Sequence, residues 1–114
     1  MRNSPTQKPK RESTILKECL IAASRAGAVV WRNNTGVFRA LDSDRIIRAG
    51  LCPGGGDLIG LTSTGQFLGI ECKRPENGRV SKLQQQWIDF INSHGGKAFV
   101  ATSGDDVTRE LGEV

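Results

Sequence analysis

Two short apolar runs, separated by a cluster of turn-forming residues, give the clearest pattern along the chain. Residues 58–61 (Leu-Ile-Gly-Leu) and 67–70 (Phe-Leu-Gly-Ile) flank a Thr-Ser-Thr-Gly segment at 62–65. Apolar runs on either side of a short Gly/Ser/Thr loop are typical of a β-hairpin. The simplest antiparallel register pairs Leu61 with Phe67 across this turn, and we expect the hairpin to adopt it.

The same register sets two acidic residues against each other at the open end of the hairpin. Asp57 lies opposite Glu71, and the two-residue period of a strand puts Lys73 on the same face. Directly opposed carboxylates have Cβ atoms about 5 Å apart and repel each other when nothing lies between them. A hard divalent cation converts this repulsion into ligation. The pattern therefore predicts a metal site.

Residues 12–26 carry apolar side chains at helical spacing and predict a helix that Gly27 ends. At about 100° per residue, Glu12 lies at the centre of the apolar stripe, whereas Glu18 projects to the side. A carboxylate on a core-facing stripe is costly unless it is paired or binds a cation, so Glu12 is a candidate for the site. The alternative is a first-turn acid that the helix dipole favours. The stripe consists of Ile15, Leu16, Cys19, Leu20 and Ala23.

The remaining pattern predicts the order α-β-β-β-α-β-α. Residues 37–51 contain five charges and no clean period, and we expect a long, partly ordered loop there. Glycines 54–56 allow a sharp turn into the hairpin, which suits either close approach to a bound phosphate or a plain flexible turn. The other predicted elements are a strand at 28–32, a helix from 81 to about 94, a strand at 97–102 and a helix at 105–111 capped by Ser103.

The composition is that of one globular domain of 114 residues, 37% hydrophobic and 25% charged. No apolar run is long enough to span a membrane, and a secretory signal is absent, so we expect a cytoplasmic protein that is not secreted. Three cysteines without zinc-like spacing indicate a reducing compartment. Residues 1–11 supply the whole net charge of +4, and we expect a flexible basic extension there, before a single domain at 12–114.

Asp57, Glu71 and Lys73 form the candidate catalytic group. Carboxylates suit Mg²⁺ or Mn²⁺, which bind through one or two of them plus water and substrate phosphate. Lys73 is placed either to deprotonate a metal-bound water or to add positive charge beside the transition state. The alternative is a surface salt-bridge cluster, because Glu-x-Lys is a frequent pattern. A Ser-His or Cys-His nucleophile would need His94, the only histidine, which falls at a helix end.

These residues, in this order, resemble the PD-(D/E)XK nuclease superfamily. The chain is most similar to the virus-type replication-repair nuclease (VRR-NUC) domain in its small stand-alone phage or bacterial form, over residues 12 to about 101. The resemblance implies a restriction-endonuclease-like α/β core, α-β-β-β-α-β, with a mixed central sheet flanked by helices. Gly56 departs from it, because the family usually has proline before the acid. The matching pieces are Glu12, residues 31–36 (Trp-Arg-Asn-Asn-Thr-Gly), residues 56–60 (Gly-Asp-Leu-Ile-Gly), Glu71-Cys72-Lys73 and residues 81–87 (Ser-Lys-Leu-Gln-Gln-Gln-Trp).

The resemblance also implies a reaction, which is hydrolysis of DNA phosphodiesters with Mg²⁺ or Mn²⁺ and no small-molecule cofactor. By position, Asp57 and Glu71 would ligate the metal together with the Cys72 backbone carbonyl, and Lys73 would lie at the nucleophilic water. The supporting residues would be Glu12, as an outer or water-mediated ligand, and Gln84, which would hold Lys73 or a phosphate. The residues expected to contact DNA are Arg32, Asn33, Asn34, Gly55, Gly56, Arg74 and Lys82.

Stand-alone members of this kind resemble Holliday-junction resolvases in being homodimers that cut branched DNA during replication, recombination or repair. A two-fold dimer matches a roughly two-fold four-way junction. Trp31, Phe38 and the 37–51 segment are the expected dimer contacts. Two alternatives remain open, namely a less selective nuclease on flapped, nicked or duplex DNA, and a DNA-binding or assembly module with weak cleavage.

Overall fold

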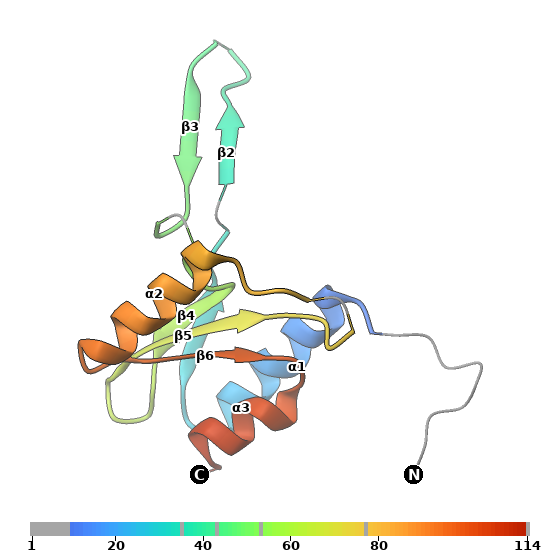
Figure 1. Cartoon of the computed structure of the whole chain (residues 1–114), viewed down its shortest axis with the longest axis vertical. Coiled ribbons are helices and arrows are strands. Elements are labelled where there is room, and N and C mark those ends of the chain that lie inside the picture. The colour runs from blue at the N-terminus through green and yellow to red at the C-terminus, as the bar shows by residue number, and fades with distance from the viewer. Residues whose placement is uncertain (1–9, 35, 43, 53, 77, 114) are drawn as a thin grey trace.

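The computed structural model describes residues 10–34, 36–42, 44–52, 54–76 and 78–113, so most of the expected basic extension at 1–11 lies outside the described residues. A mixed sheet and three helices make up the domain, which confirms the predicted fold class (Figure 1). In chain order, the elements are α1 (Glu12–Arg25), β1 (Val29–Arg32), β2 (Gly36–Arg39), β3 (Ile46–Ala49), β4 (Leu58–Leu61), β5 (Phe67–Cys72), α2 (Lys82–Ser93), β6 (Lys97–Ala101) and α3 (Gly104–Leu111).

The central sheet has the strand order β1-β4-β5-β6. β4 pairs antiparallel with both β1 and β5, whereas β6 runs parallel to β5 after the α2 crossover. The predicted hairpin register is correct, because Leu61 pairs with Phe67. Gly65 takes the positive φ of 83° that the turn requires, and its N–H donates to the Thr62 carbonyl at 2.9 Å.

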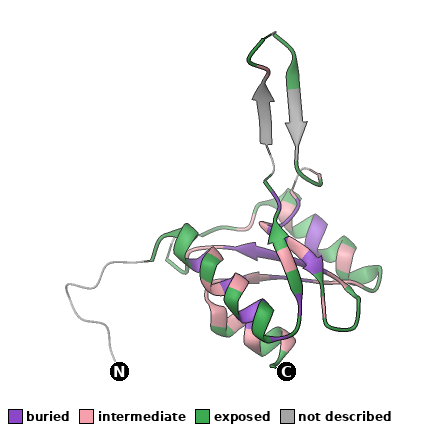
Figure 2. Cartoon of the chain, turned by 180° about the vertical axis from the view of Figure 1, so that it is seen from behind, coloured by how far each residue is buried: buried purple, intermediate pink, exposed green. Residues whose placement is uncertain are grey.

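Helices cover both faces of the sheet, and each face has its own apolar cluster (Figures 1 and 2). Alternate residues of β5 separate the two clusters: Leu68, Ile70 and Cys72 face α1 and α3, whereas Phe67 packs with Trp87 of α2. Because Glu71 alternates with Ile70 and Cys72, its side chain emerges on the α2 face. The sheet therefore directs Glu71 towards α2.

Close packing of α2 against β5 depends on a glycine. A Cβ atom added to Gly69 would lie 2.2 Å from Cη2 of Trp87, so no larger residue fits beneath this indole ring. The ring is also the largest buried side chain in the α2 cluster. Glycine in a strand commonly marks such a close approach. This contact sets how near the first turn of α2 comes to the open end of the hairpin.

Residues 37–51 form a β-hairpin arm of β2 and β3, so the prediction of a partly ordered loop was wrong. The arm stands clear of the rest of the domain in both views (Figures 1 and 2). Each strand has two adjacent apolar residues in sequence, Val37-Phe38 and Ile46-Ile47, and neither run alternates. Without alternation of apolar and polar residues, the pattern gave no strand signal.

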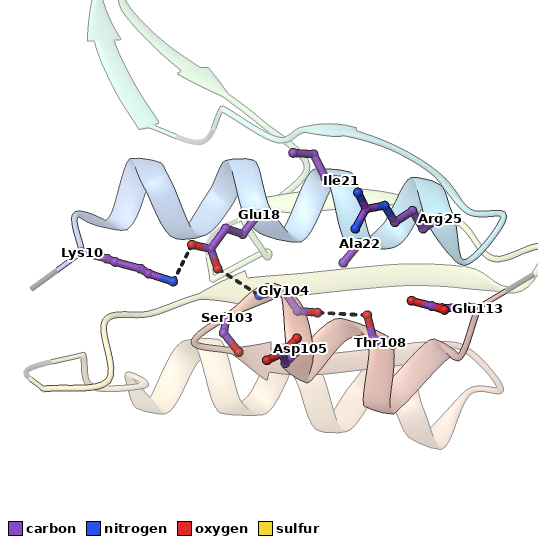
Figure 3. A pocket seen from close by; sticks show the side chains of 10 residues that line it. All are labelled: Lys10, Glu18, Ile21, Ala22, Arg25, Ser103, Gly104, Asp105, Thr108 and Glu113. Atoms are coloured by element: carbon purple, nitrogen blue, oxygen red, sulfur yellow. Dashed lines mark hydrogen bonds and ion pairs between the residues drawn. The ribbon is translucent and has the colours of Figure 1, made fainter. Parts of the chain in front are cut away.

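A hollow of about 390 Å³ lies between α1 and α3 (Figure 3). Glu18 lies in it and joins the two helices, since its carboxylate pairs with Lys10 at 2.6 Å and accepts the Gly104 N–H at 3.3 Å. Glu18 thus has a structural role in holding the N-terminus of α3. The hollow is not lined by any of the residues predicted for the catalytic site.

Within the described part of the chain, none of the helices is both long and apolar enough to cross a membrane.

Candidate active site

Asp57 and Glu71 come together at the open end of the β4–β5 hairpin. Asp57 immediately precedes the last paired position of the ladder, Leu58 with Ile70. Its Oδ2 accepts a hydrogen bond of 2.8 Å from the backbone N–H of Cys72, the residue that follows Glu71. This bond ties the aspartate to the end of β5, and it places one carboxylate beside the other as the sequence predicted.

Glu71 is an acid in an apolar setting, with only 3% of its surface exposed. The pKa of Glu71 is raised to about 8, chiefly by burial and then by the charge and a side-chain hydrogen bond of the neighbouring Asp57, although Lys73 acts in the opposite direction. A buried carboxylate pressed against a second carboxylate is unfavourable when both are ionised. Repulsion therefore opposes ionisation of both groups, and a cation would relieve it.

Two donors approach the same oxygen of Glu71. The Lys73 ammonium lies 3.6 Å from Oε1, and the Nε2 of Gln84 donates to Oε1 at 2.9 Å. Lys73 is largely covered, with 16% of its side chain exposed. The sequence predicted that Gln84 belongs to the site, but it assigned Lys73 or a phosphate as its partner. The structure gives Gln84 a different partner, the carboxylate of Glu71.

Cys72 alternates to the opposite face, where its side chain is fully buried in the cluster beneath α1. It lies against Cys19 of α1, and this contact together with burial raises the pKa of the Cys72 thiol. Cys72 is thus a small core residue. Its backbone, not its thiol, borders the acidic pair.

Asn33 is 9% exposed, and both ends of its amide are used inside the protein. Nδ2 donates to the Gly56 carbonyl at 3.0 Å, and Oδ1 accepts the Leu51 N–H at 2.9 Å. Asn33 therefore has a structural role inside the protein, and its contact with DNA stays a prediction. The side chain fastens the segment that leads into Asp57.

Gly55 and Gly56 are also buried, and their contact with DNA stays a prediction. A Cβ atom on Gly56 would lie 2.9 Å from the Ile70 carbonyl and 3.0 Å from Trp87. Glycine is needed here for packing against β5 and α2. The same crowding explains how the backbone before Asp57 comes close to Glu71.

The other predicted DNA contacts lie nearer the surface. Arg32, Asn34 and Lys82 are exposed, and Arg74 is half-buried directly after Lys73. The Nε of Arg74 is buried and has no hydrogen-bond partner among the residues that the structure describes. A buried donor without a partner is costly, so Arg74 has capacity for an acceptor.

Glu12 has the predicted rotation but not the predicted burial. Ile15 and Cys19 continue its stripe into the core, yet Glu12 itself, in the first turn of α1, is exposed. In the described ranges its carboxylate makes no hydrogen bond or ion pair with the acidic pair. The stripe argument was right about the side of the helix and wrong about how far the core reaches along it.

His94 ends α2, as the sequence predicted. Its Nδ1 lies 2.7 Å from the Phe90 carbonyl, and its ring stacks on that of Phe90 with centroids 4.0 Å apart. With these interactions, His94 caps the C-terminal end of α2.

A divalent metal fits the carboxylate pair. Among the residues that the structure describes, no group of three or more His, Cys, Asp and Glu side chains gathers in one place. Mg²⁺ needs no such cage, because it usually binds through one or two carboxylates and keeps water or substrate phosphate as its other ligands. The repulsion between Asp57 and Glu71 is the feature of this structure that a cation would offset.

The unfolding free energy of the metal-free protein is expected to fall as the pH rises from about 4.5 to about 8. Glu71 has a pKa of about 8 in the folded state, against an ordinary value of 4.5, so the folded state binds the extra proton within this window. The contribution is complete below the lower pH and lost above the upper one. Urea denaturation in EDTA across this range checks it, and Glu71→Gln should flatten the slope. Equal slopes in the two proteins would contradict the prediction.

Comparison with known proteins agrees with this geometry. A search among curated proteins finds no match to the chain. Residues 12–105 match the family model of the VRR-NUC domain, a span that runs from Glu12 to the first turn of α3 and includes the whole acidic pair and α2. The chain therefore belongs to the VRR-NUC domain family, which is a family of nucleases of the PD-(D/E)XK type.

Proposed function

We propose that this nuclease is a divalent-metal-dependent DNA endonuclease that uses Mg²⁺ or Mn²⁺ to hydrolyse phosphodiester bonds. The observation that carries the proposal is the buried Glu71 beside Asp57, with Lys73 at 3.6 Å from the Glu71 carboxylate. Asp57, Glu71 and the Cys72 carbonyl would hold the cation. Glu12, which is exposed, would reach it only through water.

The cation, when bound, would supply Lewis acidity to the phosphate ester and lower the pKa of a water molecule. The protein residues have separate tasks. The backbone N–H of Cys72 fixes Asp57, and the Nε2 of Gln84 holds Glu71 by donating to the Oε1 of Glu71. Lys73 carries the positive charge beside the pair, where it orients the attacking water or offsets charge on the phosphate.

DNA would approach over the exposed residues around the open end of the hairpin. Arg32 and Asn34 lie at the end of β1 and just after it, and Lys82 begins α2. Arg74 follows Lys73, and its Nε is buried without a hydrogen-bond partner in the described part of the chain; its half-buried guanidinium would pair with a phosphate oxygen. These contacts are to the backbone of DNA, so they would favour its shape over its sequence.

We further propose a homodimer that acts on branched DNA, in the manner of a Holliday-junction resolvase. An exposed apolar surface supports a second copy as its partner: Val29 and Leu61 are paired across β1 and β4, and Trp31 lies on the same face, with 63%, 45% and 52% exposed. We call these three residues the β1–β4 face. α2 covers β5 and β6 and leaves this face open (Figure 1). Phe38, also expected at the interface, has a side chain outside what the structure describes.

Purified protein should be incubated with labelled four-way junctions, flaps, nicked duplex and linear duplex, in Mg²⁺, Mn²⁺ or EDTA. The proposal expects symmetric cuts in the junction with metal and none in EDTA. If all substrates were cut, the protein would still be an endonuclease, but the proposed selectivity for junctions would be rejected. Tight binding without cleavage in either metal would instead identify a DNA-binding or assembly module.

Trp31→Glu is expected to convert the dimer to a monomer, because a charge at the centre of the β1–β4 face cannot be buried against a second copy. The measurement is molar mass by light scattering at several protein concentrations. Ile21→Glu is the matched control, since Ile21 is equally exposed, at 54%, on α1. A monomeric wild-type protein would refute the dimer without affecting the metal site.

A further inference from the structure

The first turn of α2 is locked by a reciprocal pair of hydrogen bonds. Ser81 is the N-cap residue, and its Oγ accepts the backbone N–H of Gln84 at 3.1 Å. In return, the Oε1 of Gln84 accepts the backbone N–H of Ser81 at 2.9 Å. This capping box satisfies two backbone donors that a helix start otherwise leaves unpaired.

The capping box also determines which end of the Gln84 amide faces the acidic pair. A backbone N–H can only donate, so the end of the amide at Ser81 must be the oxygen. The NH₂ group then points away from the cap, and its Nε2 donates to Oε1 of Glu71 at 2.9 Å. The bond to Glu71 is compatible with this orientation, and the backbone N–H of Ser81 excludes the flipped amide. The cap thus specifies which end of the Gln84 amide faces Glu71.

The hydrogen bond from Gln84 restrains the orientation of the Glu71 carboxyl group. Lys73 and Gln84 both contact Oε1 of Glu71. These two contacts restrict rotation of the carboxyl group about its last torsion, so they fix how Glu71 lies beside Asp57, where a metal ion would bind. Hydrogen bonds that orient a metal-ligating side chain in this way strongly affect metal affinity.

We propose that Ser81 is a positioning residue for the metal site. It acts through Gln84 on Glu71, and this role rests on the proposed metal-dependent function. Ser81 is exposed, and among the described residues its hydrogen bonds to side-chain atoms or from its side chain are those with Gln84, so we expect its effect to be transmitted by the capping box. The side chain that starts α2 therefore sets how well the acidic pair binds its cation.

Ser81→Ala is expected to weaken Mn²⁺ binding about 10-fold, measured by calorimetric titration of the DNA-free protein. In cleavage assays, the half-saturating Mn²⁺ concentration should rise by a similar factor, while the rate at saturating Mn²⁺ recovers most of the wild-type value. A loss of helix stability alone would not produce this split, because folded protein would retain its affinity for the metal.

Ser103→Ala is the matched control. Ser103 is the N-cap of α3, and its Oγ accepts the Asp106 N–H at 3.3 Å, so its loss removes a comparable cap with no path to Glu71. This variant should keep wild-type Mn²⁺ affinity. Ser81→Thr, which can still accept the Gln84 N–H, should restore most of the affinity. Should Ser81→Ala fold poorly, Ser81→Gly removes the same Oγ at little cost to the helix and is expected to show the same weakening.

The outcomes separate the two claims. Equal Mn²⁺ affinities in the wild-type, Ser81→Ala, Ser81→Gly and Ser103→Ala proteins would overturn the role of Ser81 and leave the nuclease intact. A wild-type protein that neither binds Mn²⁺ nor cuts DNA would overturn the proposed function, and the role of Ser81 with it. Weakened binding in both Ser81 variants, with recovery in Ser81→Thr, would support the role.

Discussion

Lys73→Met is expected to lower the cleavage rate by about 100-fold or more, while the protein stays folded and still binds its metal. Methionine keeps the length of the largely covered stem but removes the ammonium group that lies 3.6 Å from Glu71. A positioned group that moves a proton or stabilises transition-state charge typically contributes at least this much. Because the ammonium does not ligate the cation, Mn²⁺ affinity should change much less than the rate.

Single-turnover cleavage of the preferred DNA substrate, with Mn²⁺ titration in parallel, measures both quantities. Lys97→Met is the matched control, since Lys97 begins β6 and pairs with Glu110 of α3 at 3.0 Å. It removes the same charge from the chain at a site without catalytic residues and should leave cleavage unchanged. Cleavage by Lys73→Met at near the wild-type rate would remove Lys73 from the mechanism.

Asp57→Asn is expected to have opposite effects on activity and on stability. Cleavage should fall about 1,000-fold, because the site loses one of its two carboxylates and with it most of its affinity for the metal. The metal-free protein should become more stable near pH 8, because the charge that opposes ionisation of Glu71 is gone. The amide oxygen of asparagine can still accept the Cys72 N–H, so the local backbone should be preserved.

Cleavage assays measure the expected loss of activity, and thermal unfolding in EDTA measures the expected gain in stability. Asp105→Asn provides the control, because Asp105 is an exposed acid in the first turn of α3, where the helix dipole favours a negative charge. This substitution should leave cleavage unchanged and lower the stability slightly. A lower melting temperature for Asp57→Asn in EDTA would show that the two carboxylates do not oppose each other.

The acidic pair could be predicted from the sequence because, in a hairpin, the turn alone determines which residues of the two strands lie opposite each other. Once Leu61 pairs with Phe67, the positions of Asp57 and Glu71 follow from a period of two, and no long-range contact is needed. The cap of α3 was predictable for the same reason, since Ser103 bonds a backbone N–H only three residues further along the chain.

Features that depend on distant contacts could not be predicted in this way. In the sequence, Asn33 is a polar residue that follows a predicted strand. Only the folded chain shows that it is buried and hydrogen-bonded to the backbone of Gly56 and Leu51. Glu12 lies on the correct side of α1, but helical spacing carries no information about where the sheet beneath it ends. The link from Gln84 to Glu71 likewise joins two elements whose approach is set by packing of Trp87 on Gly69.

The central claim is that Asp57 and Glu71 share one divalent cation. Crystals grown with Mn²⁺ test it most directly, because anomalous scattering locates the ion without reference to activity. We expect one strong peak between the two side chains, with a carboxylate oxygen of each residue about 2.1 to 2.3 Å from it. A peak bound to only one of them, or no peak at this end of the hairpin at saturating Mn²⁺, would contradict the account.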